Sequence, residues 1–312
     1  MDLKEVINNF PNQLHQGAKS AEGFNYDQSP SKIIISAMGG SLIAGKILKL
    51  LSPQIILNEF YDLSTHIEND FLSICISWSG KTEETISAYI ESKKRGLETL
   101  VITGGNRLEE LAKADNTPLI ILPKDSIQPR YAVGYMVGAL LKAIGLEKEL
   151  DISLDSAIRE DQGHELADQI ESKIPLLYAT TQWPYLPDFW KTLFNESCKI
   201  HADTNIFPSL DHNEVASFKK EDSAKYIPII FQDEHEDPRE MIDIKAAIAI
   251  LKELGYNYLN VKISGKTPLE KVFNNYILGL WTTFYLAQKL GVDPQDIEVI
   301  EHFKKLKVAL NN

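Results

Sequence analysis

Hydroxyl side chains crowd a short turn in the first third of the chain. Residues 77–85 read Ser-Trp-Ser-Gly-Lys-Thr-Glu-Glu-Thr and follow the apolar, strand-like run 71–76. After Gly80 the spacing predicts a helix with acidic residues in its first turn. The backbone N–H groups of a helix N-terminus, together with serine and threonine O–H groups, can bind a phosphate. The segment is therefore either a phosphate-binding turn or an ordinary strand-to-helix turn with capping hydroxyls.

A glycine-rich turn precedes it in the chain. Residues 40–47 nearly match the nucleotide-binding pattern G-x-x-x-x-G-K-[ST], but Ile47 stands where a magnesium-binding hydroxyl is needed. The mismatch disfavours a nucleotide loop. Two interpretations remain open. Either Gly39 and Gly40 let the backbone approach a ligand to which Ser41 donates, or the segment is merely a tight turn.

Arg130 follows Gln128-Pro129 at the predicted start of a helix. Proline favours a helix start, whereas a cation there is not favoured by the helix dipole. A residue in a locally unfavourable position invites a functional explanation. The alternative is a solvated or ion-paired arginine.

Two residues of the second half could move protons. Glu196 lies near the end of a predicted helix, three residues after Leu193 of its apolar stripe. A carboxyl against an apolar wall can have a raised pKa, which suits a general base. His212, in Asp-His-Asn-Glu, could shuttle protons near neutral pH. A solvent-facing glutamate and a surface histidine are the alternatives.

Strand and helix patterns alternate along the chain, which indicates parallel βαβ units in a doubly wound sheet. Ligands of such sheets bind at the carboxyl ends of the strands, where the turns described above lie. We therefore predict an α/β fold of two tandem doubly wound parallel-sheet domains, 1–150 and 151–312, with a polar linker over 145–161. The first half has predicted strands at 32–37, 54–58, 71–77, 98–103 and 118–122, and helices at 41–51, 82–95, 106–114 and 130–145. The second half has strands at 175–180, 226–231 and 257–263, and helices at 187–198, 238–254, 268–290 and from about 294.

Composition excludes several classes of protein. The 312 residues carry a formal charge of −12, which disfavours a general nucleic-acid or anionic-membrane surface. No signal-peptide pattern is present, and the most apolar segment, 276–287, is too short to span a bilayer. Two cysteines without metal-like spacing suit a reducing compartment. We expect a cytoplasmic protein.

Metal-binding patterns are weak. Neither H-E-x-x-H nor C-x-x-C occurs in the sequence. The acidic run 233–237 is interpreted as a solvated turn between a strand and a helix.

Taken in order, these motifs resemble the bifunctional phosphoglucose/phosphomannose isomerases, which consist of two sugar-isomerase (SIS) domains. The resemblance covers nearly the whole chain. The hydroxyl-rich turn alone marks any SIS domain, whereas Asn-Glu-Ser followed by His-Asn-Glu is more specific. The motifs that carry it are Gly39-Gly40-Ser41, 77–85, Gln128-Pro129-Arg130, Asn195-Glu196-Ser197, His212-Asn213-Glu214 and Gly291-Val292-Asp293-Pro294.

The resemblance implies an aldose–ketose isomerase acting on a hexose 6-phosphate through a cis-enediol, without a metal or redox cofactor. Glu196 would be the base, Arg130 would stabilise the intermediate, and His212, supplied by the other subunit of a homodimer, would assist ring opening. Thr282 and Lys289 fall where the last long helix of the family meets the substrate. The phosphate and its surroundings would be held by Gly40, Ser41, Ser77, Ser79 and Thr82.

The chain departs from the family pattern at four places. Ala44-Gly45-Lys46 replaces Gly-Gly-Asp, Lys81 replaces an asparagine, Leu280 an acidic residue and Ala216 a glycine. Lys81 could strengthen phosphate binding, whereas Leu280 bears on the substrate end and on mannose activity. Two rival functions remain: a non-catalytic sugar-phosphate sensor, and an isomerase of another phosphosugar.

Overall fold

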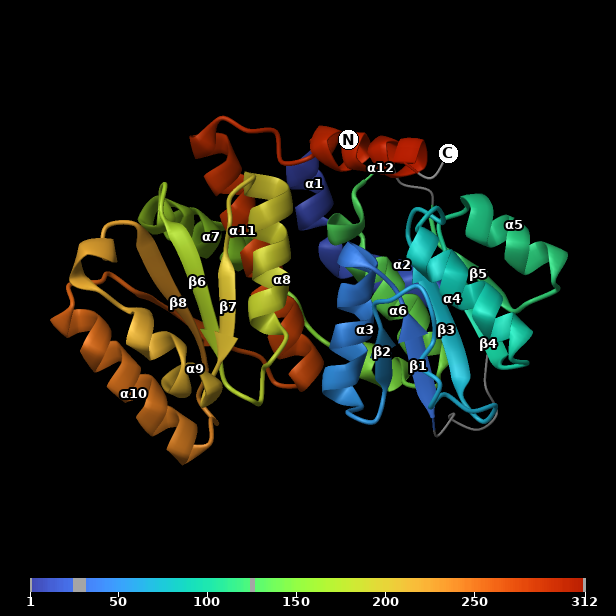
Figure 1. Cartoon of the computed structure of the whole chain (residues 1–312), viewed down its shortest axis with the longest axis horizontal. Helices are drawn as coiled ribbons and strands as arrows, with labels where there is room; N and C mark the ends of the chain where they lie inside the picture. The colour runs from blue at the N-terminus through green and yellow to red at the C-terminus, as the bar shows by residue number, and fades with distance from the viewer. Residues whose placement is uncertain (1, 25–31, 124–126, 311–312) are drawn as a thin grey trace. The chain divides into compact units, whose positions relative to one another are not determined.

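The computed structural model describes residues 2–24, 32–123 and 127–310 (Figure 1). The chain divides into two compact units. The first contains residues 1–159 and 263–277, and the second contains residues 160–262 and 278–312. Each unit is built around its own sheet.

The first sheet has five parallel strands in the order β2-β1-β3-β4-β5. Its central strands are apolar runs buried along their whole length, as expected for a parallel sheet covered on both faces. The order reverses after β1, so β1 and β3 are neighbours that both lead into helices. Their bounds are β1 (Ile33–Ser36), β2 (Ile56–Asn58), β3 (Leu72–Ser77), β4 (Glu98–Thr103) and β5 (Leu119–Ile121).

Helices cover both faces of this sheet. On one face, Tyr89 of α4 and Leu108 of α5 pack with Cys75 and Val101 of the strands. On the other face, Gly45 of α3 lies against Ile35 of β1. The preceding residue, Ile34, points to the opposite face and packs with Ala88 of α4, because side chains alternate along a strand. The helices are α1 (Leu3–Asn8), α2 (Phe10–Ser20), α3 (Gly39–Leu51), α4 (Glu83–Lys94), α5 (Asn106–Ala114) and α6 (Val133–Ala143), with η1 (Pro129–Tyr131) and η2 (Glu147–Leu150) as short 3₁₀ turns.

Glycines let α2 and α6 pack backbone against backbone. A Cβ atom added at Gly17 would lie 2.0 Å from the carbonyl oxygen of Tyr135, and one at Gly138 would lie 2.0 Å from that of Leu14. On its other side, Phe10 of α2 packs on Phe273, near the start of α11 (Pro268–Leu290), with 5.6 Å between the tilted rings' centroids. This contact joins the first residues of α11 to the first unit.

The second sheet has four strands in the order β7-β6-β8-β9, with β6 parallel to β7 and β8. Ile244 of α10 packs with Tyr178 of β6. Trp190 of α8 meets Phe231 of β8 edge to face at 5.1 Å. The strands are β6 (Ile174–Ala179), β7 (Asp203–Ile206), β8 (Tyr226–Asp233) and β9 (Leu259–Ile263). The helices are α7 (Ser156–Ile170), α8 (Leu186–Leu193), the π turn η3 (Phe194–Cys198), α9 (Ser209–His212), α10 (Pro238–Glu253) and α12 (Glu298–Leu310), with the 3₁₀ turns η4 (Glu214–Ser217) and η5 (Lys220–Asp222).

The predicted α/β fold with two parallel sheets is confirmed. The sequence did not predict α1, α2 or β7, and α7 begins at Ser156, inside the predicted linker. Strand β7 lacked a signal because Asp203-Thr-Asn-Ile is polar and none of its residues is buried. Within the described part of the chain, no helix is both long and apolar enough to cross a membrane.

Candidate active site

The hydroxyl turn, residues 77–82, joins the end of β3 to the start of α4. Gly80 takes a left-handed conformation, with φ of +64°, and its N–H donates to Ser77 Oγ at 3.0 Å. Ser77 Oγ also lies 3.0 Å from Thr82 Oγ1. The turn therefore gathers hydroxyl groups at the N-terminus of a helix, which is the arrangement that binds anions.

Capping does not explain the threonine of this turn. Thr82 is the N-cap residue of α4, yet its side chain makes no cap hydrogen bond with the helix. Its hydroxyl pairs with Ser77 instead. Ser79 is exposed, and its Oγ accepts the N–H of Lys81 at 3.2 Å. The capping interpretation is wrong for Thr82, and the phosphate-binding interpretation is retained.

The segment after β4 fixes the shape of the hydroxyl turn. Thr103 Oγ1 donates to the Ser77 carbonyl at 2.7 Å, and Asn106 Nδ2 donates to the Ser79 carbonyl at 2.9 Å. The Leu108 N–H donates to the Gly80 carbonyl at 2.9 Å. The turn's carbonyl groups are thus turned toward α5. Asn106 was not singled out from the sequence, because its role depends on the neighbouring strand.

Ser41 joins the glycine-rich turn to the hydroxyl turn. Its buried Oγ accepts the backbone N–H of Trp78 at 3.1 Å, so the N-termini of α3 and α4 lie side by side. A Cβ atom added at Gly40 would lie 2.6 Å from the backbone nitrogen of Arg130. Glycine at this position thus lets α3 begin in contact with η1.

Arg130 is a fully buried cation. Its guanidinium carbon lies 4.8 Å from the centre of the Tyr131 ring, and its carbonyl accepts the hydroxyl of Tyr276 at 2.7 Å. Its backbone nitrogen lies beside Gly40, at the start of α3.

Trp78 ties the hydroxyl turn to the interior of the unit. Its indole N–H donates to the Ile127 carbonyl at 3.0 Å, and its ring stacks on Tyr135 with 5.6 Å between centroids. The sequence signal for this role is an aromatic residue in the middle of a hydroxyl-rich turn.

In the second unit, Glu196 lies in the π turn that follows α8, and it is half-buried. Lys199 ends the turn with φ of +59°, and its ammonium group donates to the carbonyls of Glu196 and Asp296, each at 2.5 Å. The thiol of Cys198 donates to the Thr283 carbonyl at 3.2 Å, so the π turn packs on α11. Such π turns are frequent at functional sites.

Thr282 and Lys289 differ in environment although both lie on α11. Thr282 is fully buried, and its hydroxyl donates to the Leu278 carbonyl at 2.8 Å within the helix. Lys289 is exposed and forms an ion pair with Asp168 of α7. The hydrogen bond from Lys289 lowers the pKa of Asp168. Leu280, the family departure on this helix, is buried.

His212 is the exposed last residue of α9. Two residues on, the Glu214 carboxylate accepts hydrogen bonds from Tyr178 Oη and, at 2.8 Å, from Asn205 Nδ2. Burial, with Glu214 as a second cause, raises the pKa of Tyr178. These bonds anchor the segment to β6 and β7 while the imidazole of His212 stays exposed.

The corresponding edge of the second sheet carries carboxylates. The run 233–237 begins at the last residue of β8. Glu234 and His235 are exposed, as predicted for a solvated turn, whereas Asp233 and Glu236 are only 1% and 8% exposed, so the prediction is wrong for these two residues. Glu236 accepts the Asp233 N–H at 2.9 Å and the Thr180 hydroxyl at 2.6 Å. Glu240 accepts both the N–H and the hydroxyl of Thr181. Across the described residues, no group of three or more His, Cys, Asp or Glu is arranged to hold a metal ion.

We predict that Gly80→Ala prevents the hydroxyl turn from adopting its present backbone conformation. Gly80 and Gly96 both have left-handed φ values, but a Cβ atom at Gly80 would lie 1.6 Å from the Gly105 carbonyl, whereas one at Gly96 has open space. Both alanine variants carry about 1–2 kcal/mol of backbone strain. Only Gly80→Ala should weaken the binding of inorganic phosphate, by more than about tenfold in calorimetric titration. Equal affinities of the two variants would contradict this role.

We predict that Glu236 makes stability depend on pH. Burial raises the pKa of its carboxyl, although hydrogen bonds from Thr180 and the Asp233 amide oppose the shift. Its stabilising contribution is therefore fully present below the unfolded pKa of about 4.3 and is lost as pH rises through the folded pKa. In urea unfolding, wild type should lose stability relative to Glu236→Gln as pH rises from about 4.5 to 7.5. Glu253→Gln, at the exposed end of α10, controls for a lost surface charge. A difference that does not change with pH would refute the prediction.

Comparisons with known proteins agree with the resemblance. Residues 159–306 match the family model of the bacterial phospho-glucose isomerase C-terminal SIS domain. A bifunctional phosphoglucose/phosphomannose isomerase of Thermoplasma volcanium is 32% identical over 289 residues, covering 88% of this chain and 90% of the relative. A D-glucosamine-6-phosphate 4-epimerase of Sulfolobus acidocaldarius is 26% identical, covering 93% of this chain and 90% of the relative.

The fold has solved counterparts. The crystal structure of a hypothetical protein from Thermus thermophilus superposes with a TM-score of 0.75 at 14% identity, covering 97% of this chain and 89% of that one. At this identity the match concerns the fold alone. The identity, coverage and matching motifs place the chain in the bifunctional phosphoglucose/phosphomannose isomerase family.

Proposed function

We propose that the protein interconverts glucose 6-phosphate and fructose 6-phosphate, and also acts on mannose 6-phosphate. The observation that carries the proposal is the hydroxyl turn beside the start of α3, with the buried Arg130 in backbone contact with Gly40. Family membership supplies the reaction class. The proposal requires neither a metal nor a redox cofactor.

The substrate phosphate is held by the hydroxyls of Ser41, Ser77, Ser79 and Thr82 and by the N-termini of α3 and α4. Lys81, exposed in the same turn, adds positive charge. This grip lies away from the reacting carbons, so its binding energy orients the open-chain sugar for reaction.

In the chemical step, Glu196 removes the proton on C2 of the open-chain aldose and returns it to C1. The proton on O2 moves to O1, so the aldehyde becomes a hydroxymethyl group and C2 becomes the ketone. Removal of the C2 proton leaves a negatively charged cis-enediolate, and Arg130 stabilises that charge, as a fixed cation does best in a water-poor site. Thr282 and Lys289 complete the proposed substrate contacts.

Ring opening needs a proton to be moved at the ring oxygen before this step. We assign it to His212, an exposed imidazole on an anchored segment. In the proposal the protein is a cytoplasmic homodimer, and each His212 serves the active site of the other subunit.

A second candidate activity is epimerisation at C4 of a phosphorylated amino sugar. It is favoured by the similarity to the 4-epimerase, which spans most of both chains. Side-by-side assays with fructose 6-phosphate, mannose 6-phosphate and glucosamine 6-phosphate separate the two candidates. Turnover of glucosamine 6-phosphate alone would replace our assignment.

We predict that Glu196→Gln lowers kcat for fructose 6-phosphate by about 10²–10⁴-fold, because the amide cannot accept the C2 proton. Binding should stay within about threefold of wild type, since the phosphate grip is untouched. A coupled assay and calorimetry measure the two quantities. The control is Glu221→Gln, an exposed position in the same unit. Wild-type turnover in Glu196→Gln would remove this residue as the base.

We predict that two inactive variants complement each other. If His212 comes from the partner, a mixed dimer of Glu196→Gln and His212→Ala chains has one intact site. Refolding the two variants together should then restore about a quarter of wild-type activity, since half of the dimers are mixed. Either variant refolded alone is the control. No recovery, with mixed dimers demonstrated by differential tags, would place both residues on one subunit.

A further inference from the structure

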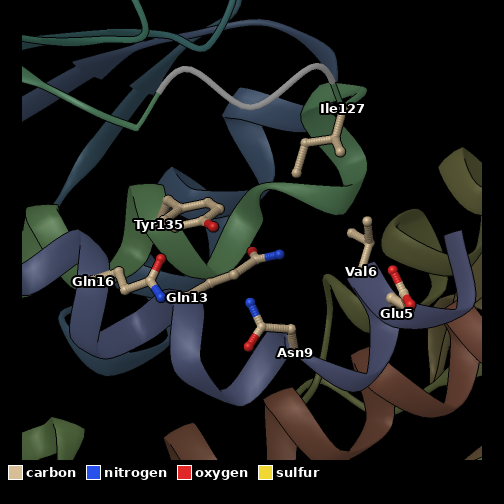
Figure 2. A pocket seen from close by; sticks show the side chains of 7 residues that line it. All are labelled: Glu5, Val6, Asn9, Gln13, Gln16, Ile127 and Tyr135. Atoms are coloured by element: carbon tan, nitrogen blue, oxygen red, sulfur yellow. The ribbon is translucent and has the colours of Figure 1, made fainter. Parts of the chain in front are cut away.

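Each of the two segments to which we assign a function is held by a side chain of its own. In the first unit, Trp78 of the hydroxyl turn donates to the Ile127 carbonyl and stacks on Tyr135, and both of these partners line the pocket shown in Figure 2. In the second unit, the segment is the π turn, residues 194–198, which carries Glu196. The residue that holds it is Lys199.

The ammonium group of Lys199 lies between two backbone carbonyls of the second unit. One carbonyl belongs to Glu196, three residues earlier, and the other to Asp296, 97 residues later, and each N···O distance is 2.5 Å. The last carbonyls of a helix have no partner within the helix, and a cation there also interacts favourably with the helix dipole. Lys199 therefore joins the end of the π turn to a distant segment through charge-assisted hydrogen bonds.

The backbone of Lys199 has a conformation that lysine rarely adopts. Its φ of +59° and ψ of +30° lie in the left-handed region, and its N–H donates to the Phe194 carbonyl. Glycine fits such a helix end at lower cost. A backbone outlier of this kind points to a functional requirement. Because a glycine would end the turn but could not bridge the two carbonyls, the side chain explains the lysine.

The distant carbonyl belongs to the segment that follows α11. This segment contains Gly291-Val292-Asp293-Pro294, a motif that has no part in the mechanism proposed above. Gly291 has φ of +67° and ends the helix. Asp293 then accepts the N–H of Gln295 on Oδ1 at 2.8 Å and the N–H of Asp296 on its carbonyl at 3.2 Å. The motif therefore fixes the turn that presents the Asp296 carbonyl to Lys199.

The π turn has a second point of attachment. The thiol of Cys198 donates to the Thr283 carbonyl of α11 at 3.2 Å. Ser197 and Cys198 are fully buried, whereas Glu196 is half-buried. The backbone around Glu196 is thus held at two places, one on α11 and one just after it.

We propose that Lys199 is a positioning residue for the isomerase reaction. It ties the turn that carries Glu196 to the segment 293–296 and so fixes the direction in which the Glu196 carboxyl points. This inference rests on the proposed function, because it needs Glu196 to be the base. A displacement of about 1 Å in a catalytic group can lower a rate by about 10²-fold.

The test compares three variants of Lys199 in the full chain, assayed with fructose 6-phosphate. Lys199→Met removes the charge and the donors and should lower kcat by about 10–100-fold. Its KM should stay within about threefold of wild type, because the phosphate grip lies in the first unit. Lys199→Arg keeps a cation with donors and should restore kcat to within about fivefold of wild type. Lys245→Met, an exposed change on α10, is the matched control.

Lys199→Gly separates positioning from stability. It relieves the left-handed backbone, so it should unfold at a higher temperature than Lys199→Met, yet its kcat should be equally low. Recovery of wild-type kcat in Lys199→Gly would show that the lysine acts only on stability and would overturn the proposal. The variant also keeps the test decisive if Lys199→Met fails to fold.

A double-mutant cycle tests the path through the segment after α11. Asp293→Ala removes the acceptor of the Gln295 N–H and should lower kcat by about threefold or more in wild type, but by less than about twofold in Lys199→Met. Decrements that multiply would overturn the coupling between Lys199 and this segment.

Hydrogen exchange tests the attachment without any substrate. Mass spectrometry of the peptide 194–200 should show about tenfold faster amide exchange in Lys199→Met than in wild type or Lys245→Met. Unchanged exchange, or wild-type kcat in Lys199→Met, would overturn the role of Lys199 alone. A wild type without turnover, with faster exchange in Lys199→Met, would instead overturn the proposed function and the catalytic part of this proposal with it.

Discussion

The hydrogen bond from the Trp78 amide to the Ser41 hydroxyl holds together the start of two helices. It is possible only because β1 and β3 are neighbours in a parallel sheet, so that their carboxyl ends, and the helices that follow, meet at one edge. The hydroxyl pair of Ser77 and Thr82, the approach of η1 to Gly40 and the burial of Arg130 all follow from this meeting. The chain thus brings two helix N-termini and the backbone of η1 together at one edge of the sheet.

Glycines contribute to the packing of the first unit because they have no side chain. Gly40 lets η1 approach α3, Gly80 lets the hydroxyl turn fold against the Gly105 carbonyl, and Gly17 and Gly138 bring α2 and α6 into backbone contact. At each of these positions, the methyl group of an alanine would clash with the neighbouring backbone and force the packing to change. Overpacking of this kind costs about 1–3 kcal/mol even where the neighbours can shift.

Much of this architecture could be predicted from local sequence. The apolar run of β3 and the apolar face of α11 were predictable from their residue patterns, and the hydroxyl turn was recognisable by its composition. The features that could not be predicted depend on contacts between residues that are distant in the sequence. Strand β7 is polar and forms because β6 pairs with it, and Asn106 matters because Ser79 lies beside it. In the acidic run after β8, the buried Glu236 accepts a hydrogen bond from Thr180. Sequence supplied the residue types for Glu196 and His212, whereas the π turn and the anchoring by Glu214 came from the structure.

The carboxyl ends of the strands are followed by different chemical groups in the two sheets. After β3 the chain leaves hydroxyls and helix N-termini available, whereas after β8 it places its own Glu236 and Glu240 on the threonines at the end of β6. The carboxyl groups of Glu236 and Glu240 accept the hydrogen bonds of Thr180 and Thr181, so these donors at the edge of the second sheet are already used. The two sheets therefore differ in the groups that follow their strands: hydroxyl groups at a helix N-terminus after β3, and carboxyl groups already bonded to threonines after β8.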